Sequence, residues 1–150
     1  MDQTVLSRRL LQRDRIIAVV GWSTDRDRPS HDVTAYMHAQ GYRMVPVNPA
    51  YAGHYDALLD SVCHASLQDA AQALAQRGMA LQMVNVFRRS EAVPEVVDAA
   101  IACGARSLWL QLGVVHAAAV QRARTHGLEV VMDRCLKIEH ARLALAPDML

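Results

Sequence analysis

The stretch Ile16-Ile17-Ala18-Val19-Val20-Gly21 decides the fold. Its five apolar residues run without interruption, which is typical of a strand that is buried on both faces of a parallel sheet. A polar loop, residues 21–30, follows the glycine and leads into a segment with helical spacing. A strand followed by a helix predicts the first half of a right-handed βαβ crossover.

The same unit recurs four times along the chain. Each time a glycine ends a segment with helical spacing and precedes a β-rich run; these glycines are Gly41, Gly78, Gly104 and Gly127. Glycine is favoured just after a helix because it takes the left-handed conformation without a Cβ clash. The runs that follow cover residues 42–47, 79–87, 106–110 and 128–132. The alternation predicts a three-layer α/β domain, with about five parallel strands and helices on both faces of the sheet.

Helical spacing is clearest between residues 93 and 101. An apolar residue stands there at each position of one helical stripe: Val93, Val96, Val97, Ala100 and Ile101. Serines at Ser30, Ser66 and Ser90 stand where N-caps are expected, and Ser66 has Asp69 three residues later as in a capping box.

The remaining segments complete the domain. Residues 1–13 predict an amphipathic helix whose sheet-facing side chains are Val5, Leu6, Leu10 and Leu11, and residues 137–145 predict a closing helix. Residues 53–65 fit neither period and predict a long loop or a short strand near Val62. We expect one domain over residues 1–150, with the amino-terminal helix in 1–15 and the core in 16–145.

Composition narrows the function classes. The formal net charge is +1, which argues against a general nucleic-acid binder. We expect a cytoplasmic protein without membrane association, since no apolar run reaches the length of a span and the start lacks a signal-peptide core. The three cysteines form no CxxC pair, and the seven histidines lack zinc-motif spacing, so no metal site is expected.

Ligands of open α/β sheets bind outside the carboxyl ends of the strands. That rule selects five segments, residues 21–23, 47–49, 86–89, 111–113 and 133–135. They combine glycine, amide and arginine side chains with a few apolar ones, which suits a long ligand with phosphates at one end. The first loop is the usual phosphate-binding turn, because free N–H groups and the helix dipole attract anions there.

A nicotinamide cofactor fits the sequence poorly. The loop after the first strand lacks the GxGxxG pattern of dinucleotide-binding folds. The second strand ends in Asn48-Pro49, although an acidic residue is needed there to hold the ribose of NAD.

The strand-end motifs together resemble the small bacterial CoA-binding proteins. These are stand-alone Rossmann-like domains, similar to the CoA-binding domain of the succinyl-CoA synthetase α subunit. The resemblance runs from about Ile16 to Leu143 and rests on motifs in the same order: residues 17–23, 28–30, 45–49, 85–88, 108–113 and 131–135. Each motif alone has little specificity, whereas five at successive strand ends are fairly specific.

The resemblance implies a role for each matching residue. Gly21, Trp22, Ser23, Arg28 and Ser30 would line the phosphate end of CoA, and Asn48, Pro49 and Tyr51 would flank its adenosine. Val86, Phe87 and Arg88 would cover the middle of the ligand, Gln111, Leu112 and Gly113 would face the pantetheine arm, and Arg134 and Cys135 would close the site. Two departures are Trp22, where the family usually has a small residue, and Gln82, near which it often has an acidic one.

The expected function is therefore non-catalytic binding of coenzyme A or acyl-CoA. No nucleophile or acid–base pair is recognisable, so the residues do not indicate an enzyme. Two alternatives stay open: a Rossmann-type enzyme that uses a nucleotide cofactor or a thioester, and a regulatory subunit that docks on a ligase-like partner. A homodimer is also compatible with the sequence. Arg88, Arg134 and Asn48-Pro49 also have plainer interpretations, as solvated surface arginines and a turn.

Overall fold

The computed structural model describes residues 2–145. Its helices are α1 (Gln3–Arg13), α2 (Pro29–Ala39), α3 (Leu67–Ala75), α4 (Val93–Ala102), α5 (Ala117–Thr125) and α6 (Leu136–Leu145). Its strands are β1 (Ile16–Val20), β2 (Arg43–Val47), β3 (Tyr55–Asp56), β4 (Ser61–Val62), β5 (Met83–Val86), β6 (Ser107–Leu110) and β7 (Glu129–Val131). Two 3-10 turns, η1 (Pro49–Tyr51) and η2 (Ser90–Ala92), follow β2 and precede α4.

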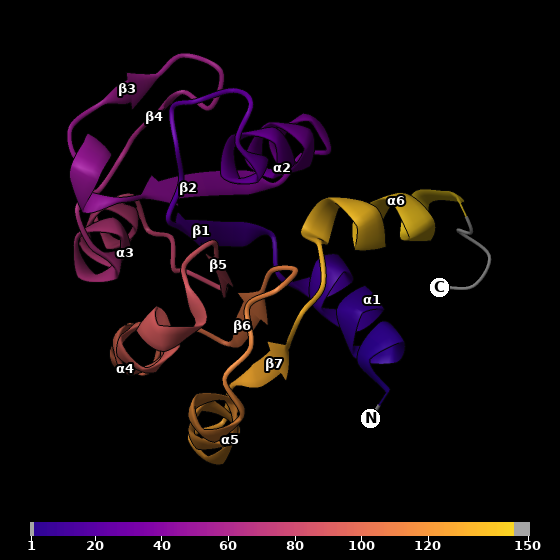
Figure 1. Cartoon of the computed structure of the whole chain (residues 1–150). Coiled ribbons are helices and arrows are strands. Elements are labelled where there is room, and N and C mark those ends of the chain that lie inside the picture. Colours follow the sequence, from indigo (N-terminus) through magenta and orange to yellow (C-terminus); the bar gives the residue numbers. More distant parts are fainter. Residues whose placement is uncertain (1, 146–150) are drawn as a thin grey trace.

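Five strands form one parallel sheet in the order β2-β1-β5-β6-β7, as Figure 1 shows. The chain leaves β1 for β2 on one side and returns to β5 on the other, so the strand order reverses at β1 and β5. Beyond β2, an isolated parallel bridge joins Val47 to His64, just after the β3-β4 hairpin. The predicted Rossmann-like α/β fold is therefore confirmed, including the short strand near Val62.

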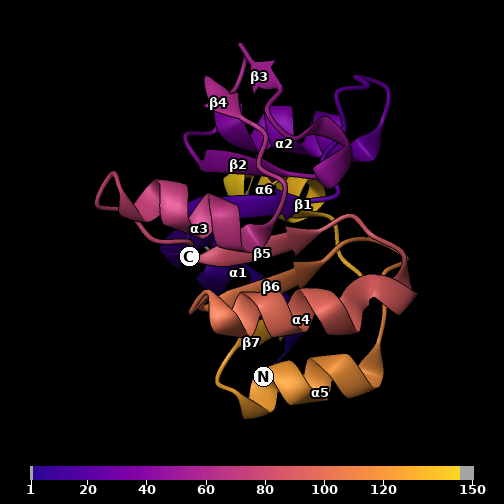
Figure 2. The same ribbon diagram turned by 90° about the vertical axis from the view of Figure 1, so that its left-hand side faces the viewer.

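Helices cover both faces of the sheet. On one face α3, α4 and α5 pack against alternate strand residues such as Val84 and Val86, and Figure 2 shows these three helices in front of the sheet. On the other face α1, α2 and α6 pack against the intervening residues, such as Met83 and Trp109. Side chains of a strand point to opposite faces in turn, so a continuous apolar run is what a sheet covered on both sides requires.

The helix ends agree only in part with the expected caps. Ser66 caps α3, and its side chain accepts a hydrogen bond from the Asp69 amide. Ser30 is not an N-cap, because α2 already begins at Pro29, the residue type that favours the first helical position. Ser90 is not one either, since it opens the 3-10 turn and α4 starts at Val93.

The amino-terminal helix packs as expected except at one residue. Leu6, Leu10 and Leu11 are buried, whereas Val5 is 52% exposed, so its predicted place on the sheet-facing side was wrong. At the end of α1 the fully buried Asp14 accepts two hydrogen bonds from the Arg13 side chain and one from the Ser107 hydroxyl. These contacts fix α1 to the amino end of β6.

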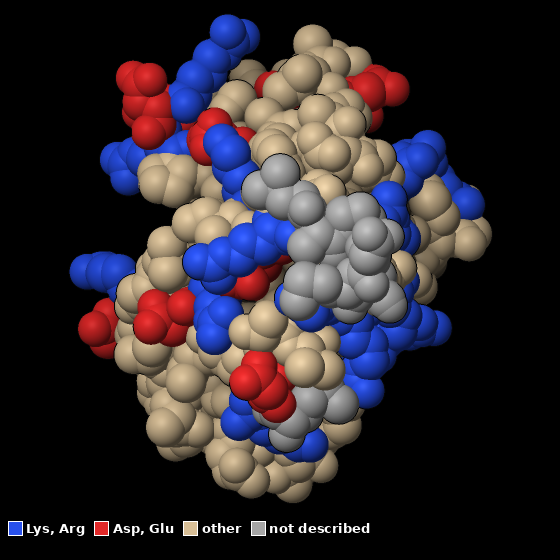
Figure 3. Space-filling model, turned by 90° about the vertical axis from the view of Figure 1, so that its right-hand side faces the viewer, with Lys and Arg blue, Asp and Glu red and all other residues tan. Residues whose placement is uncertain are grey.

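Basic side chains gather on the face formed by α1 and α6, as Figure 3 shows. Most of them have an acidic partner nearby: Arg9 and Arg13 contact Glu129, Lys137 contacts Asp32, and Arg142 contacts Glu139. The positive charge of this face is therefore largely compensated. Among residues 2–145, no helix is long and apolar enough to cross a membrane.

Acid should destabilise the protein through His140 of α6. Its Nδ1 lies 2.9 Å from the Tyr36 hydroxyl, and its ring packs edge-on against Tyr36 and Tyr42. Burial lowers the pKa of His140, and the positive charge of Arg15 lowers it further. The unfolded chain then binds the proton more readily, so this contribution to stability is present above about pH 6.5 and lost as pH falls below that value.

Urea unfolding on either side of that pH measures the effect. We expect the loss of unfolding free energy on acidification to be smaller in His140→Gln than in the unmodified protein. The exposed His126 provides the matched control, His126→Gln. Equal pH dependence in His140→Gln and the unmodified protein would show that His140 plays no part.

Candidate functional site

A cavity of about 580 Å³ opens at the carboxyl ends of β1, β2 and β5. We call it the strand-end cavity. It contains five of the predicted site residues: Gly21, Asn48, Pro49, Phe87 and Arg88. The starts of α3 and α4 form its other walls, through Ala65, Ser66, Leu67, Glu95, Val96 and Ala99. Three of the five predicted strand ends therefore meet in one cavity, at the point where the strand order reverses.

Gly21 brings these three strand ends together. Its amide donates to the Val47 carbonyl at 2.9 Å, and the next-door Val20 carbonyl accepts from the Phe87 amide at 2.8 Å. The backbone at Gly21 has a φ of +88°, and a Cβ built there would overlap the Phe87 carbonyl. The strand-end cavity thus has a floor of backbone that only glycine allows.

Asn48 ties the first loop to the end of β2. Its side-chain Nδ2 donates to the Trp22 carbonyl at 2.8 Å, and its Oδ1 accepts from the Ala50 amide at 2.9 Å. Both ends of the amide are used, which explains why an amide stands where dinucleotide-binding proteins have a carboxylate: a carboxylate could not donate to the Trp22 carbonyl.

Arg88 supplies the positive charge of the strand-end cavity. Its guanidinium lies 3.4 Å from the carboxylate of Glu95, which also lines the cavity, and both side chains are exposed. A pair of this kind contributes little to stability in water. It holds the guanidinium at the cavity mouth, where an anionic ligand can replace the carboxylate.

The ends of β6 and β7 form a second, hydrogen-bonded cluster. The buried Gln111 donates through Nε2 to Asn85 Oδ1 at 2.6 Å, and the Trp109 indole donates to the Arg134 carbonyl at 2.9 Å. The Gly113 amide donates to the Asp133 carboxylate at 2.7 Å. Asp133 has a φ of +60°, so this loop is held in an unusual backbone conformation.

The other predicted site residues differ in exposure. Trp22, Ser23, Ser30 and Val86 are buried; Tyr51 and Cys135 are half-buried; Arg28 and Leu112 are exposed; Arg134 lies 3.3 Å from Glu139.

The Trp22 ring packs 6.1 Å from the rings of His31, Tyr51 and His54, so it holds the first loop against the η1 turn. Ligand contacts by these residues stay predictions. Gln82 accepts from the Arg15 and Ile16 amides at the amino ends of the strands and does not line the strand-end cavity.

Four polar residues near these strand ends were given no role in the predicted site. Ser66 and Glu95 line the strand-end cavity, and Asp133 and Asn85 belong to the hydrogen-bonded cluster. Asn85 could have been predicted from the sequence, because it is the one polar residue in the buried strand Met-Val-Asn-Val. Its Nδ2 is buried without a hydrogen-bond partner among residues 2–145.

The sequence of the whole core matches one family. The model of the CoA binding domain family covers residues 15–141. The chain belongs to the CoA-binding domain family. The uncharacterized protein YneT of Bacillus subtilis is 37% identical over 132 residues, which is 88% of this chain and 90% of the relative.

Two solved structures share the fold of this chain over nearly its whole length. The protein ID.343 of Thermus thermophilus has a TM-score of 0.81 and 34% identity, covering 95% of this chain and 99% of its own. A protein of Pyrococcus horikoshii has a TM-score of 0.81 and 30% identity, with 94% and 92% covered. The shared architecture therefore extends over nearly the whole chain.

Proposed function

We propose that this chain binds coenzyme A or an acyl-CoA without catalysing a reaction, and that the ligand lies along the carboxyl ends of the strands. The observation that supports this most is the strand-end cavity, in which residues from three predicted motifs meet. Its volume of about 580 Å³ is in the usual range for small-molecule sites.

The walls of the cavity suit a nucleotide with a long arm. Val20, Val47, Leu67 and Val96 offer apolar surface, while Arg88 offers a cation that can pair with a phosphate. Gly21 lets a ligand approach the backbone closely. The exposed Leu112 lies past the end of β6, on the course that a pantetheine arm would take toward Arg134 and Cys135.

A binding role fits the hydrogen bonding at the strand ends. Gln111 is engaged with Asn85, Asp133 with the Gly113 amide, and Arg134 with Glu139. Side chains that hold one another in this way define the shape of a surface. This arrangement supports recognition of a ligand more than proton transfer to it.

Calorimetric titration of the purified protein tests the proposal. We expect CoA to bind and NADH to bind at least about tenfold more weakly, since no carboxylate ends β2 to hold the 2′-hydroxyl of the adenosine ribose of NADH. Comparison of CoA with 3′-dephospho-CoA and pantetheine shows which part of the ligand contributes. No heat of binding with millimolar CoA, or tighter binding of NADH, would refute the proposal.

A further inference from the structure

A second cavity, of about 590 Å³, lies at the open edge of β2. We call it the β2-edge cavity. It shares no lining residue with the strand-end cavity. Ile16 lines the β2-edge cavity and Val20 lines the other, so the two are roughly 13 Å apart along β1 at ~3.3 Å per residue.

Positive charge dominates the β2-edge cavity. Arg15, Arg43 and Arg77 line it together with His38 and His64, whereas Asp60 is its one carboxylate. The Asp60 carboxylate is already engaged, because Tyr55 donates to it at 2.6 Å. The three arginines come from separate segments, so the charge gathers here through the fold and not through a run in the sequence.

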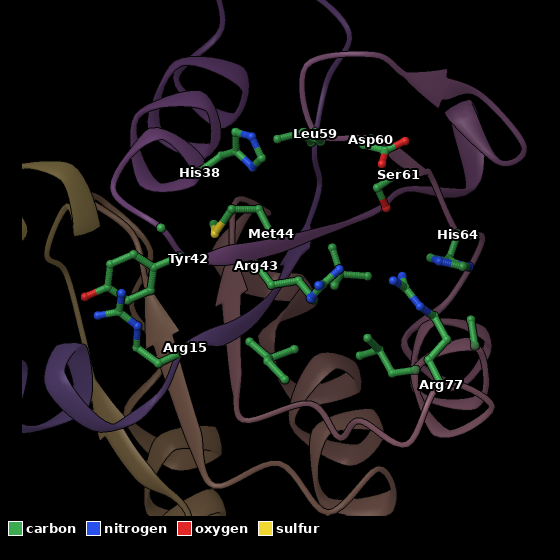
Figure 4. Close-up of a pocket in the computed structure, with 15 residues that line it drawn as sticks. Arg15, His38, Tyr42, Arg43, Met44, Leu59, Asp60, Ser61, His64 and Arg77 are labelled. Atoms are coloured by element: carbon green, nitrogen blue, oxygen red, sulfur yellow. The ribbon is translucent and has the colours of Figure 1, made fainter.

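The three arginines of this cavity are not paired with acidic side chains of the described chain. Among residues 2–145, no carboxylate lies within ion-pair distance of Arg15, Arg43 or Arg77, whereas most basic residues of the α1–α6 face are paired. Figure 4 shows the guanidinium groups of Arg43 and Arg77 pointing toward one another, with His64 beside them. Like charges in this arrangement repel, and an anion between them would turn the repulsion into attraction.

Apolar residues also line the cavity, on both faces of the sheet edge. Met44 and Leu59 line it on the side of α2, and Ile16, Val45 and Leu74 line it on the side of α3. Arg15 is held at one end by stacking on the Tyr42 ring, with its guanidinium carbon 4.0 Å from the ring centroid. Apolar surface beside cationic groups suits an organic molecule that carries phosphate groups, since bare phosphate would leave the apolar surface uncovered.

The exposed strand edge does not suit a peptide. The Arg43 amide and the Val47 carbonyl are bonded toward β1, so in the alternating ladder only residues 44 and 46 turn their backbone groups outward. Residue 46 is a proline without an N–H, and its carbonyl already accepts from the His64 amide at 3.0 Å. Met44 alone is free to pair, which is too little for strand addition.

We propose that the β2-edge cavity binds a small organic phosphate. The phosphate groups lie between the guanidinium groups of Arg43 and Arg77, and the organic part covers Met44 and Leu59. This site is independent of the proposed CoA site, and its two probes, pyrophosphate and ADP, separate the contribution of the phosphates from that of the organic part.

Amide chemical-shift mapping with these probes tests the proposal. We expect pyrophosphate to shift the Ser61 and His64 amides, and ADP to shift Met44 and Leu59 as well and to bind more tightly. Because the readout is specific to each residue, ADP bound near Gly21 and Asn48 is recognised separately. Shifts confined to Gly21 and Asn48, or ADP binding no tighter than pyrophosphate at Ser61 and His64, would overturn the proposal.

Variants that remove the positive charge of the β2-edge cavity provide a second test of the proposal. Arg43 and Arg77 are exposed, and within residues 2–145 their side chains make no hydrogen bond, so Arg43→Gln/Arg77→Gln should keep the fold, which circular dichroism checks. We expect this variant to weaken binding at the Ser61 and His64 amides by about tenfold or more. Arg106→Gln, at an exposed arginine outside the cavity, should change it less than about twofold. Unchanged affinity in the double variant would also overturn the proposal.

Discussion

Gly21→Ala is expected to destabilise the protein by more than about 3 kcal/mol, which for a chain of this length lowers the Tm by roughly 10 °C. Two effects add. The φ of +88° disfavours any L side chain, and the new Cβ would overlap the backbone carbonyl of Phe87. Phe87 directly follows β5, and its amide donates to the Val20 carbonyl, so this residue is held beside Gly21 and a shift of its backbone would disturb that hydrogen bond.

Gly78→Ala is the matched control for this substitution. Gly78 has a φ of +73°, but a Cβ there would meet no atom within 4 Å. It should therefore lose only about 1–2 kcal/mol, the cost of the left-handed conformation. Thermal unfolding of both variants separates the two effects. Equal losses in the two proteins would contradict the close approach of the strand ends at Gly21.

Ala99→Trp is expected to weaken CoA binding by about tenfold or more, equivalent to at least ~1.4 kcal/mol, with little change in Tm. Ala99 lies half-buried on α4 and lines the strand-end cavity. An indole at this position would occupy volume that the ligand needs. The cavity already provides space for the ring, so the core need not expand.

Ala102→Trp provides the comparison. Ala102 lies at the end of the same helix, is exposed and does not line the cavity. In the same calorimetric titration, the Ala102→Trp variant should bind CoA with the affinity of the unmodified protein. A Trp at residue 99 that leaves CoA affinity intact, in a protein that unfolds normally, would place the ligand outside the strand-end cavity.

The fold was readable because its signals are local. Gly41, Gly78, Gly104 and Gly127 each have positive φ and each end a helix, so a glycine after an apolar stripe marked the unit correctly. β1 could be predicted to the residue, because both its faces are buried and its apolar run stops at Gly21. The start of α2 was harder to predict, because Ser30 suggested an N-cap while Pro29 favoured the first position of the helix. Pro29 was the better guide than Ser30.

The errors and omissions arose where contacts between distant segments decide the outcome. Val5 fits the helical stripe of α1, yet no neighbouring element covers it in the folded chain described by residues 2–145. Trp22 stands in a polar loop, yet its ring is buried and packs against His31 of α2 and against Tyr51 and His54 in the segment after β2. The β2-edge cavity takes its arginines from three segments that come together only in the folded chain.

The sequence predicted one site along five strand ends, whereas in the structure these strand ends fall into two groups. The ends of β1, β2 and β5 share the strand-end cavity, whereas those of β6 and β7 form the neighbouring cluster around Gln111 and Asp133. The rule that ligands bind at the carboxyl ends of parallel strands selects one edge of the sheet and does not distinguish one strand from another. Which strand ends enclose a volume depends on the helices packed beside them, here α3 and α4.

A crystal structure of the protein grown with CoA tests the central claim most directly. We expect density for the ligand in the strand-end cavity, in contact with Gly21 and Asn48 and with a phosphate close to Arg88. Full-length CoA density elsewhere on the protein, with the strand-end cavity empty at saturating ligand, would contradict it.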